Sequence, residues 1–521
     1  MKTLTILSVS ILLLLLHYSC DNNKIPNPQS PTVESPVPIS YKIPVDVNPA
    51  LQKKLNAKGD NFYDLNVEFN KFSWQAFIAI FWPMDVAGKP MPNFTDQGQS
   101  EWLSWKESFQ VYRADGGVPP PWGSPRTGGA LPHDTSLVSQ EDFRIYLTAQ
   151  TPTHKGLSKN IADEVDQAFA GRLFDQKGNT VVYEILMNEA EFSYLKDNKL
   201  YNINGQINFT RTGQIANFPK GNYEKDTVGA IEIKLAWKIL TDSDYKERYY
   251  QSQGYIIDEE TQDLVQEDLG LIGFHISQKT PTGKQWVWST FEHIDNIDQN
   301  TIEKNGNKVP IHPTLYDPNC EICPVNVDLY NPPNAYVFNQ GPHGNLWVEG
   351  QDTVYANSNV MKTQSKRMID IPVRVQQLNK KMQDYLKSKG SVFQYYQLID
   401  TQYPTDQEAL PGNHTEEGYQ LPASVVNKSG GNPNLTYLTN ITMETFFQGG
   451  NQPASAFMEA NPASNIQVFG TEGCMGCHSS AGIYTLDSKA KLTKLPQLSG
   501  DFSWLLTKKA QWDKSKPIPT D

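Results

Sequence analysis

The sequence predicts an α+β protein in which an antiparallel, sheet-rich body is framed by helices. Three observations lead to this expectation. Apolar residues recur at helical intervals near the start and the end of the body, and they alternate with polar residues in its middle. A Thr-Pro-Thr-Gly turn at 280–283 separates two alternating runs closely enough for a hairpin. A helical C-terminal segment follows this body.

Two segments have the pattern of core-facing helices. Residues 64–82 place large apolar side chains at roughly helical intervals, and the pattern stops at Pro83, which cannot continue a helix. Residues 373–387 repeat the pattern directly after Pro372, a residue suited to a helix start. These two helices are expected to flank the sheet.

The middle of the chain predicts strands. Residues 231–239 alternate Ile, Ile, Leu, Trp and Ile with mostly polar residues. The runs 269–276 and 286–294 flank the turn and are expected to pair as a hairpin, while 143–147 and 181–187 are further strand candidates.

The N-terminus predicts export. Lys2 precedes an apolar run of 13 residues, Leu4 to Leu16, which is the length of a signal segment and too short to span a bilayer core of about 30 Å. Residues 1–19 then form a signal peptide, Cys20 is the lipidated first residue of a bacterial lipoprotein, and the Pro-rich stretch 20–40 is a tether. The alternative is an ordinary secretory peptide that leaves Cys20 as an odd thiol.

The net charge of the chain argues against one class of binding partner, nucleic acid. The chain of 521 residues has 45 Lys and Arg against 57 Asp and Glu, a net charge of −12. Nucleic-acid binding needs clustered positive charge to neutralise phosphates, so no nucleic-acid partner is expected. The predicted membrane contact is therefore the lipid anchor, in the bacterial cell envelope, facing the periplasm or the cell surface.

The residues that bind a cofactor are predicted to lie in a C-terminal segment at 406–521, which follows a body at 41–405. Cys474-Met475-Gly476-Cys477-His478 has the C-x-x-C-H spacing of covalent haem c attachment. Two thiols so spaced can each bond a vinyl group of one porphyrin, and the adjacent His is then held as an axial iron ligand. One haem c is expected, on Cys474, Cys477 and His478.

Other interpretations of the cysteines remain open. Cys474 and Cys477 could form a disulfide, which leaves His478 unexplained, or a thioredoxin-like redox pair, although no βαβ pattern surrounds them. They could also join Cys320 and Cys323 in a zinc site, but the intervening 150 residues far exceed a zinc-ribbon spacing. We interpret Cys320 and Cys323 as a local disulfide.

A sixth iron ligand is expected upstream of the motif. None of the 43 residues after His478 is Met or His. Met443 is the first candidate because it lies on a short amphipathic segment that leads into the haem loop. Met458, and His275 or His293 on the predicted hairpin, are alternatives, and an open iron is a further one.

Several aromatic-rich motifs carry a family resemblance. They are FSWQAFIAIFWP at 72–83, WVWSTFEHIDN at 286–296, YQLIDTQYP at 396–404 and TMET at 442–445, together with the C-x-x-C-H block. The chain resembles a bacterial family of large, exported, single-haem cytochrome c-like proteins over most of its mature length. This resemblance implies haem ligation by Cys474, Cys477 and His478, and it implies no established substrate.

Together these observations predict an exported monohaem c-type cytochrome that passes single electrons to or from a redox partner protein. The alternative is a haem-dependent oxidoreductase, or a gas- or peroxide-responsive sensor, with an open iron in the large body. A surface binding protein with a purely structural C-x-x-C-H is a third interpretation. The length of the body keeps the second one open, because electron transfer alone needs only about 100 residues.

Overall fold

The structure, a computed structural model, describes part of the chain. The described residues are 33–57, 62–124, 145–146, 173–257, 264–319, 326, 336–341, 344–349, 364–367, 370–404, 414–415, 418–419, 438–445, 474–478, 481–486 and 492–516. The chain divides into a unit at 1–34 and a unit at 35–521, and every element below belongs to the second unit. The predicted signal peptide, Cys20, Cys320, Cys323, Met458 and the expected boundary near residue 405 lie outside the described residues.

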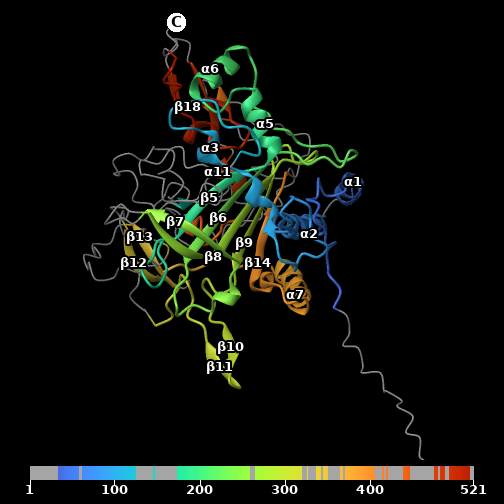
Figure 1. Ribbon diagram of the computed structural model, residues 1–521, viewed down its shortest axis with the longest axis vertical. Coiled ribbons are helices and arrows are strands. Elements are labelled where there is room, and N and C mark those ends of the chain that lie inside the picture. The colour runs from blue at the N-terminus through green and yellow to red at the C-terminus, as the bar shows by residue number, and fades with distance from the viewer. Residues whose placement is uncertain are drawn as a thin grey trace, which may run out of the picture. The chain divides into compact units, whose positions relative to one another are not determined.

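An eight-stranded sheet forms the centre of the second unit, in the order β14-β9-β8-β6-β5-β3, with β7 pairing to β8 and β4 to β7 (Figure 1). Neighbouring strands are antiparallel except β4 and β7. The strands are β3 (Lys106–Glu107), β4 (Ile145–Tyr146), β5 (Val182–Met187), β6 (Ile231–Ile239), β7 (Gln251–Ile257), β8 (Leu264–Gln278), β9 (Val287–His293) and β14 (Tyr396–Gln402).

Short two-stranded sheets surround it: β1 (Pro83–Met84) with β2 (Gln99–Ser100), β10 (Thr301–Lys304) with β11 (Asn307–Pro310), β12 (Tyr336–Gly341) with β13 (Gly344–Glu349), β15 (His414–Thr415) with β16 (Gly418–Tyr419), and β17 (Gly482–Leu486) with β18 (Leu492–Ser499).

The described α-helices are α1 (Pro49–Asn56), α2 (Phe62–Ile80), α3 (Ser108–Val111), α5 (Glu189–Asp197), α6 (Ile203–Arg211), α7 (Val373–Ser388), α11 (Cys474–His478) and α12 (Leu505–Lys508). Short 3₁₀ turns lie at Glu101–Ser104, Lys246–Arg248 and Val392–Tyr395. Within the described part of the chain, no helix is both long and apolar enough to cross a membrane.

The predicted fold class is confirmed, because the structure is a mixed α+β protein with a mainly antiparallel sheet and flanking helices. The two expected helices are α2 and α7, the alternating run at 231–239 is β6, and β8 and β9 pair across the predicted turn. Of the run at 143–147, only Ile145 and Tyr146 are described, and they form β4.

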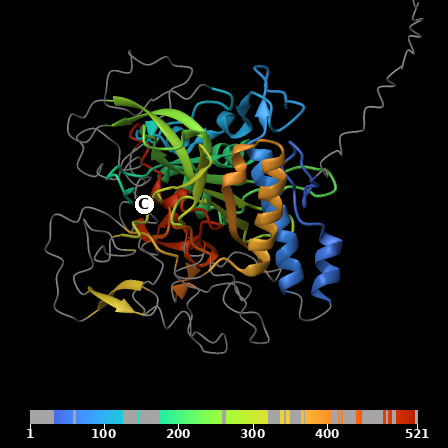
Figure 2. The same ribbon diagram turned by 90° about the horizontal axis from the view of Figure 1, so that it is seen from below.

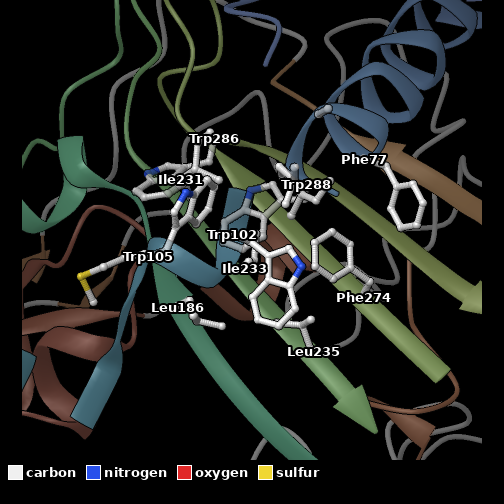
Figure 3. Packing of buried hydrophobic residues seen from close by; sticks show 14 of the residues in the cluster. Phe77, Trp102, Trp105, Leu186, Ile231, Ile233, Leu235, Phe274, Trp286 and Trp288 are labelled. Carbon is white, nitrogen blue, oxygen red and sulfur yellow. The ribbon is translucent and has the colours of Figure 1, made fainter. Parts of the chain in front are cut away.

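Helices α2 and α7 cover one face of the sheet and lie side by side near its β14 edge (Figures 1 and 2). Phe77 of α2 stacks on Phe291 of β9 with ring centroids 4.4 Å apart, and it meets the edge of Phe274 of β8. Figure 3 shows Phe77, Phe274, Leu235 and Trp102 among the residues of this cluster. The helix-covered face is therefore the apolar core that the periodicity predicts.

The other face of the sheet is covered by C-terminal segments. Residues 438–445, α11 and the turn at 500–503 hydrogen-bond to strands β5, β6, β9 and β14 or to neighbours of these strands. Strand β17 packs against α6 and α12, and Figure 1 shows α6 and β18 together at one end of the sheet. We call the face that residues 438–445, α11 and the turn at 500–503 cover the second face of the sheet.

Candidate functional site

The second face carries charged and hydroxyl side chains in its middle. Lys234 of β6, His275 of β8 and Thr290 of β9 are cross-strand neighbours in the antiparallel register. Successive side chains of a strand alternate between faces, so these three share a face, opposite to Phe274 and Phe291. Such a polar row inside a protein needs partners, because a buried polar group without a hydrogen bond costs free energy.

Residues 438–445 supply those partners. Asn440 donates from Nδ2 to Thr290 Oγ1 at 2.8 Å, and the His275 ring contacts the Glu444 carboxylate at 2.8 Å between Nε2 and Oε1. Gly273 of β8 is required here, because a Cβ at this position would lie 1.9 Å from Thr442 Oγ1. The close approach fixes this segment on the sheet.

A second anchor of the same segment is the buried carboxylate of Glu292. It pairs with Arg367 and accepts a hydrogen bond from the backbone N–H of Ile441 at 2.8 Å. The motif at 286–296 thus contributes a charged clamp as well as core residues. The clamp holds residues 438–445 next to α11.

Helix α11 contains the whole C-x-x-C-H motif in one short turn of helix. The N–H of Met475 donates to Gln402 Oε1 at the end of β14, at 3.0 Å. The Cys474 sulfur lies 3.7 Å from the carbonyl oxygen of Leu438, within reach of a weak thiol hydrogen bond. Both contacts seat the motif against the sheet and beside residues 438–445.

His478 is oriented by two contacts. Its Nδ1 lies 2.8 Å from the carbonyl oxygen of Phe502, and its ring lies 4.3 Å from the ring of Trp288 between centroids. A carbonyl only accepts hydrogen bonds, so Nδ1 carries the proton and Nε2 carries the lone pair. Burial lowers the pKa of His478 to about 4, so the ring is neutral at neutral pH.

This geometry fits an axial haem ligand. A metal-binding His typically donates its other ring N–H to a carbonyl or carboxylate, which fixes the tautomer and the ring orientation. The Phe502 carbonyl would have that role for His478. Cys474, Cys477 and His478 would hold the haem, and the neutral imidazole is the form that can bind iron.

The turn that presents this carbonyl is strained. Asp501 and Phe502 have φ angles of 52° and 69°, and a bulky residue at positive φ is a genuine outlier. The neighbouring Gly500 has no room for a Cβ, which would lie 2.5 Å from the carbonyl oxygen of Gly482. Such strain typically costs about 1–3 kcal/mol per residue and persists only where surrounding contacts impose it.

A buried ion pair imposes this conformation. The Asp501 carboxylate pairs with Lys279, and both side chains are at most 1% exposed. Asp501 also accepts from the N–H of Phe218 at 2.6 Å. These contacts fix the turn, and the turn fixes His478.

Several charged side chains of the site remain partly exposed. The side chains of His275 and Glu444 are 14% and 21% exposed, and Lys234 is also only partly buried. His275 and Lys234 lower the pKa of His478, while Glu444 raises it. A group held on α11 would therefore meet a charged environment rather than a purely apolar one.

The structure gives different surroundings to the sixth-ligand candidates. Met443 is fully buried in an apolar cluster with Tyr183, Ala236 and Ile272, separate from the main cluster that contains Trp288. His275 acts electrostatically on His478. His293 is buried, bonds to the carbonyl of Arg248 at 3.0 Å and stacks on Tyr249, as a structural His does.

Sequence reasoning missed the supporting residues. The sequence does not identify Trp288, Phe502 and Glu444 as supports of His478, because neither a positive φ nor a contact between distant segments leaves a periodic signal. The tripeptide Ser-Gly-Asp at 499–501 is typical of a turn, and it is the local pattern that could have indicated this loop.

Among the described residues, no group of three or more His, Cys, Asp or Glu side chains is arranged to hold a bare metal ion. Comparison with known proteins found no family model, no curated protein and no solved structure that matches this chain.

Proposed function

We propose that this chain is an exported, lipid-anchored, monohaem c-type cytochrome that passes single electrons to and from a redox partner in the cell envelope. Cys474 and Cys477 bond the haem, His478 is its axial ligand, and Cys20 carries the lipid. The observation that supports this most is the orientation of His478, whose Nδ1 is engaged by the Phe502 carbonyl while Nε2 keeps its lone pair.

The surroundings of α11 support the same proposal. A haem supplies a reversible one-electron couple whose potential depends on burial, axial ligation and nearby charge. The chain contributes a neutral His478 bonded to a strained, ion-paired turn and packed against the ring of Trp288, and these contacts keep the axial ligand in one orientation. A fixed ligand costs little reorganisation when the charge at the iron changes.

The proposal is tested by maturing the full chain in a host with the c-type haem machinery. We expect a haem that resists acid extraction and sharp reduced absorption bands. Changing both Cys474 and Cys477 to Ala should abolish covalent haem, whereas changing Cys320 and Cys323 to Ala should retain it. Absence of covalent haem from the wild-type protein would refute the proposal.

The alternative function is a haem-dependent oxidoreductase, or a gas- or peroxide-responsive sensor, with an open iron. One observation favours it: the partly exposed His275–Glu444 pair beside His478 resembles a proton-handling dyad more than an inert packing surface. Carbon monoxide distinguishes the two functions. A shift of the reduced spectrum supports the open iron, and an unchanged spectrum supports the electron carrier.

A further inference from the structure

The starting observation is a buried carboxyl on α5. Glu191 is fully buried, and among the described residues neither of its carboxylate oxygens has a hydrogen-bond partner. Its backbone N–H is satisfied by Asn188, the N-cap of α5, at 3.1 Å. A buried carboxylate without a partner is costly, so such a group takes up a proton instead.

The groups around Glu191 further favour its protonated form. Burial and the negative charges of Glu232 and Asp501 raise the pKa of Glu191 well above its ordinary value. Burial, assisted by the nearby Glu191 and Glu232 carboxyls when they are ionised, raises the pKa of Tyr112 well above its ordinary value. At neutral pH, Glu191 and Tyr112 are therefore both neutral.

Glu232, on β6, differs from Glu191 and Asp501 in reaching the protein surface, where it can exchange a proton with water. It is only partly buried, and Ser503 Oγ donates to its Oε2 at 3.1 Å. Burial raises its pKa from 4.5 to about 7, against the lowering effects of Ser503, Lys234 and Lys509. Its protonation therefore changes near neutral pH.

The turn at 501–503 joins this carboxyl to the proposed iron ligand. Phe502 accepts from His478, Ser503 donates to Glu232, and Asp501 pairs with Lys279. Two peptide-bonded residues thus link His478 to Glu232. The charged or titratable groups of this cluster lie on α5 and β6, directly after α3, β8 and α12, and in the turn at 500–503: Glu191, Glu232, Lys234, Tyr112, Lys279, Lys509 and Asp501.

We propose that Glu232 is a redox-linked proton site, which binds one proton when the haem is reduced and releases it when the haem is oxidised. The inference rests on the proposed haem function. An external one-electron reductant converts ferric to ferrous haem, and one proton from water binds the Glu232 carboxylate. Reoxidation returns the electron to an acceptor and the proton to water.

Electrostatics explains why Glu232 binds its proton on reduction of the haem and releases it on oxidation. Ferric haem has one more positive charge than ferrous haem, and positive charge nearby favours the ionised carboxylate. Reduction removes that charge and favours the protonated form. Glu191 stays protonated in both states, because it is fully buried and has no partner among the described residues.

The test is the midpoint potential of the intact haem protein as a function of pH, measured with mediators by absorption. One proton per electron lowers the potential by about 59 mV for each tenfold fall in proton concentration. We expect the wild-type potential to fall as the pH rises through neutral, with a slope between zero and this limiting value. Glu232→Gln, which retains an acceptor for Ser503, should make the potential independent of pH.

Two variants serve as controls. Glu191→Gln replaces a neutral acid by a neutral amide and should keep the slope, as should Glu303→Gln on the exposed β10. A flat wild-type potential in a protein with normal haem bands overturns the proton site and leaves the haem function standing. A slope that persists in Glu232→Gln, or is lost in Glu191→Gln, overturns the assignment to Glu232.

Discussion

Asp501→Asn tests whether the buried ion pair holds the strained turn. The substitution keeps the size of the side chain, and Asn tolerates the left-handed φ of 52° at this position. It removes the negative charge that faces Lys279, whose side chain is 1% exposed. Breaking a buried pair by removing one partner typically costs about 3–5 kcal/mol.

The expected cost lies at the lower end of that range. The Asn amide oxygen still accepts one hydrogen bond, and Lys279 also donates to Asn217 Oδ1 at 2.7 Å. We therefore expect a loss of about 3 kcal/mol in the free energy of unfolding at pH 7. Adding Lys279→Met should recover much of this loss, because no unpaired charge then remains buried.

Asp226→Asn is a matched control. Asp226 has the same φ of 52° and also pairs with a lysine, Lys42, but their side chains are 61% and 60% exposed. An exposed pair contributes little, so this variant should unfold like the wild type in urea. If Asp501→Asn unfolds at the same urea concentration as Asp226→Asn, the ion pair does not hold the turn and the reasoning is refuted.

Three further predictions concern the site. Trp288→Ala should lower the yield of covalent haem and alter its spectrum, whereas Trp105→Ala, which removes an equally buried ring, should affect only stability. Glu232→Gln should raise the melting temperature at pH 8 and leave it unchanged at pH 4. The pKa of Glu232 is raised to about 7 in the folded state, so its stabilising contribution is present below pH 4.5 and is lost as the pH rises through 7; an equal effect at both pH values would contradict this. Met443→Ala should change the reduced absorption spectrum if Met443 is the sixth ligand, and a spectrum identical to the wild type would eliminate it.

The parts of the fold that sequence predicts are those set by local periodicity. Residues 231–239 alternate strictly enough to define β6, and Pro83 and Pro372 mark the end of α2 and the start of α7. The hairpin of β8 and β9 follows from one turn between two alternating runs. In each case the signal lies within a window of about twenty residues.

Of the candidate site, only Cys474, Cys477 and His478 could be identified from the sequence. The spacing of Cys474, Cys477 and His478 is local, and the structure places all three in α11. Their support is not local: Phe502 lies 24 residues after His478, and Trp288 lies on a strand nearly two hundred residues before it. The positive φ of Phe502 depends on a buried ion pair that no sequence pattern announces.

The polar second face also has a consequence for how the chain is made. Strands β5, β6, β8 and β9 leave the ribosome long before the segments 438–445, 474–478 and 500–503 that cover them. Until then the uncovered face presents Lys234, His275 and Thr290 together with Trp288 and the apolar side chains that later enclose Met443. Exposed apolar surface of this kind makes folding intermediates prone to associate. The C-terminal segments that carry the site thus also remove from water a sheet surface that would otherwise promote association.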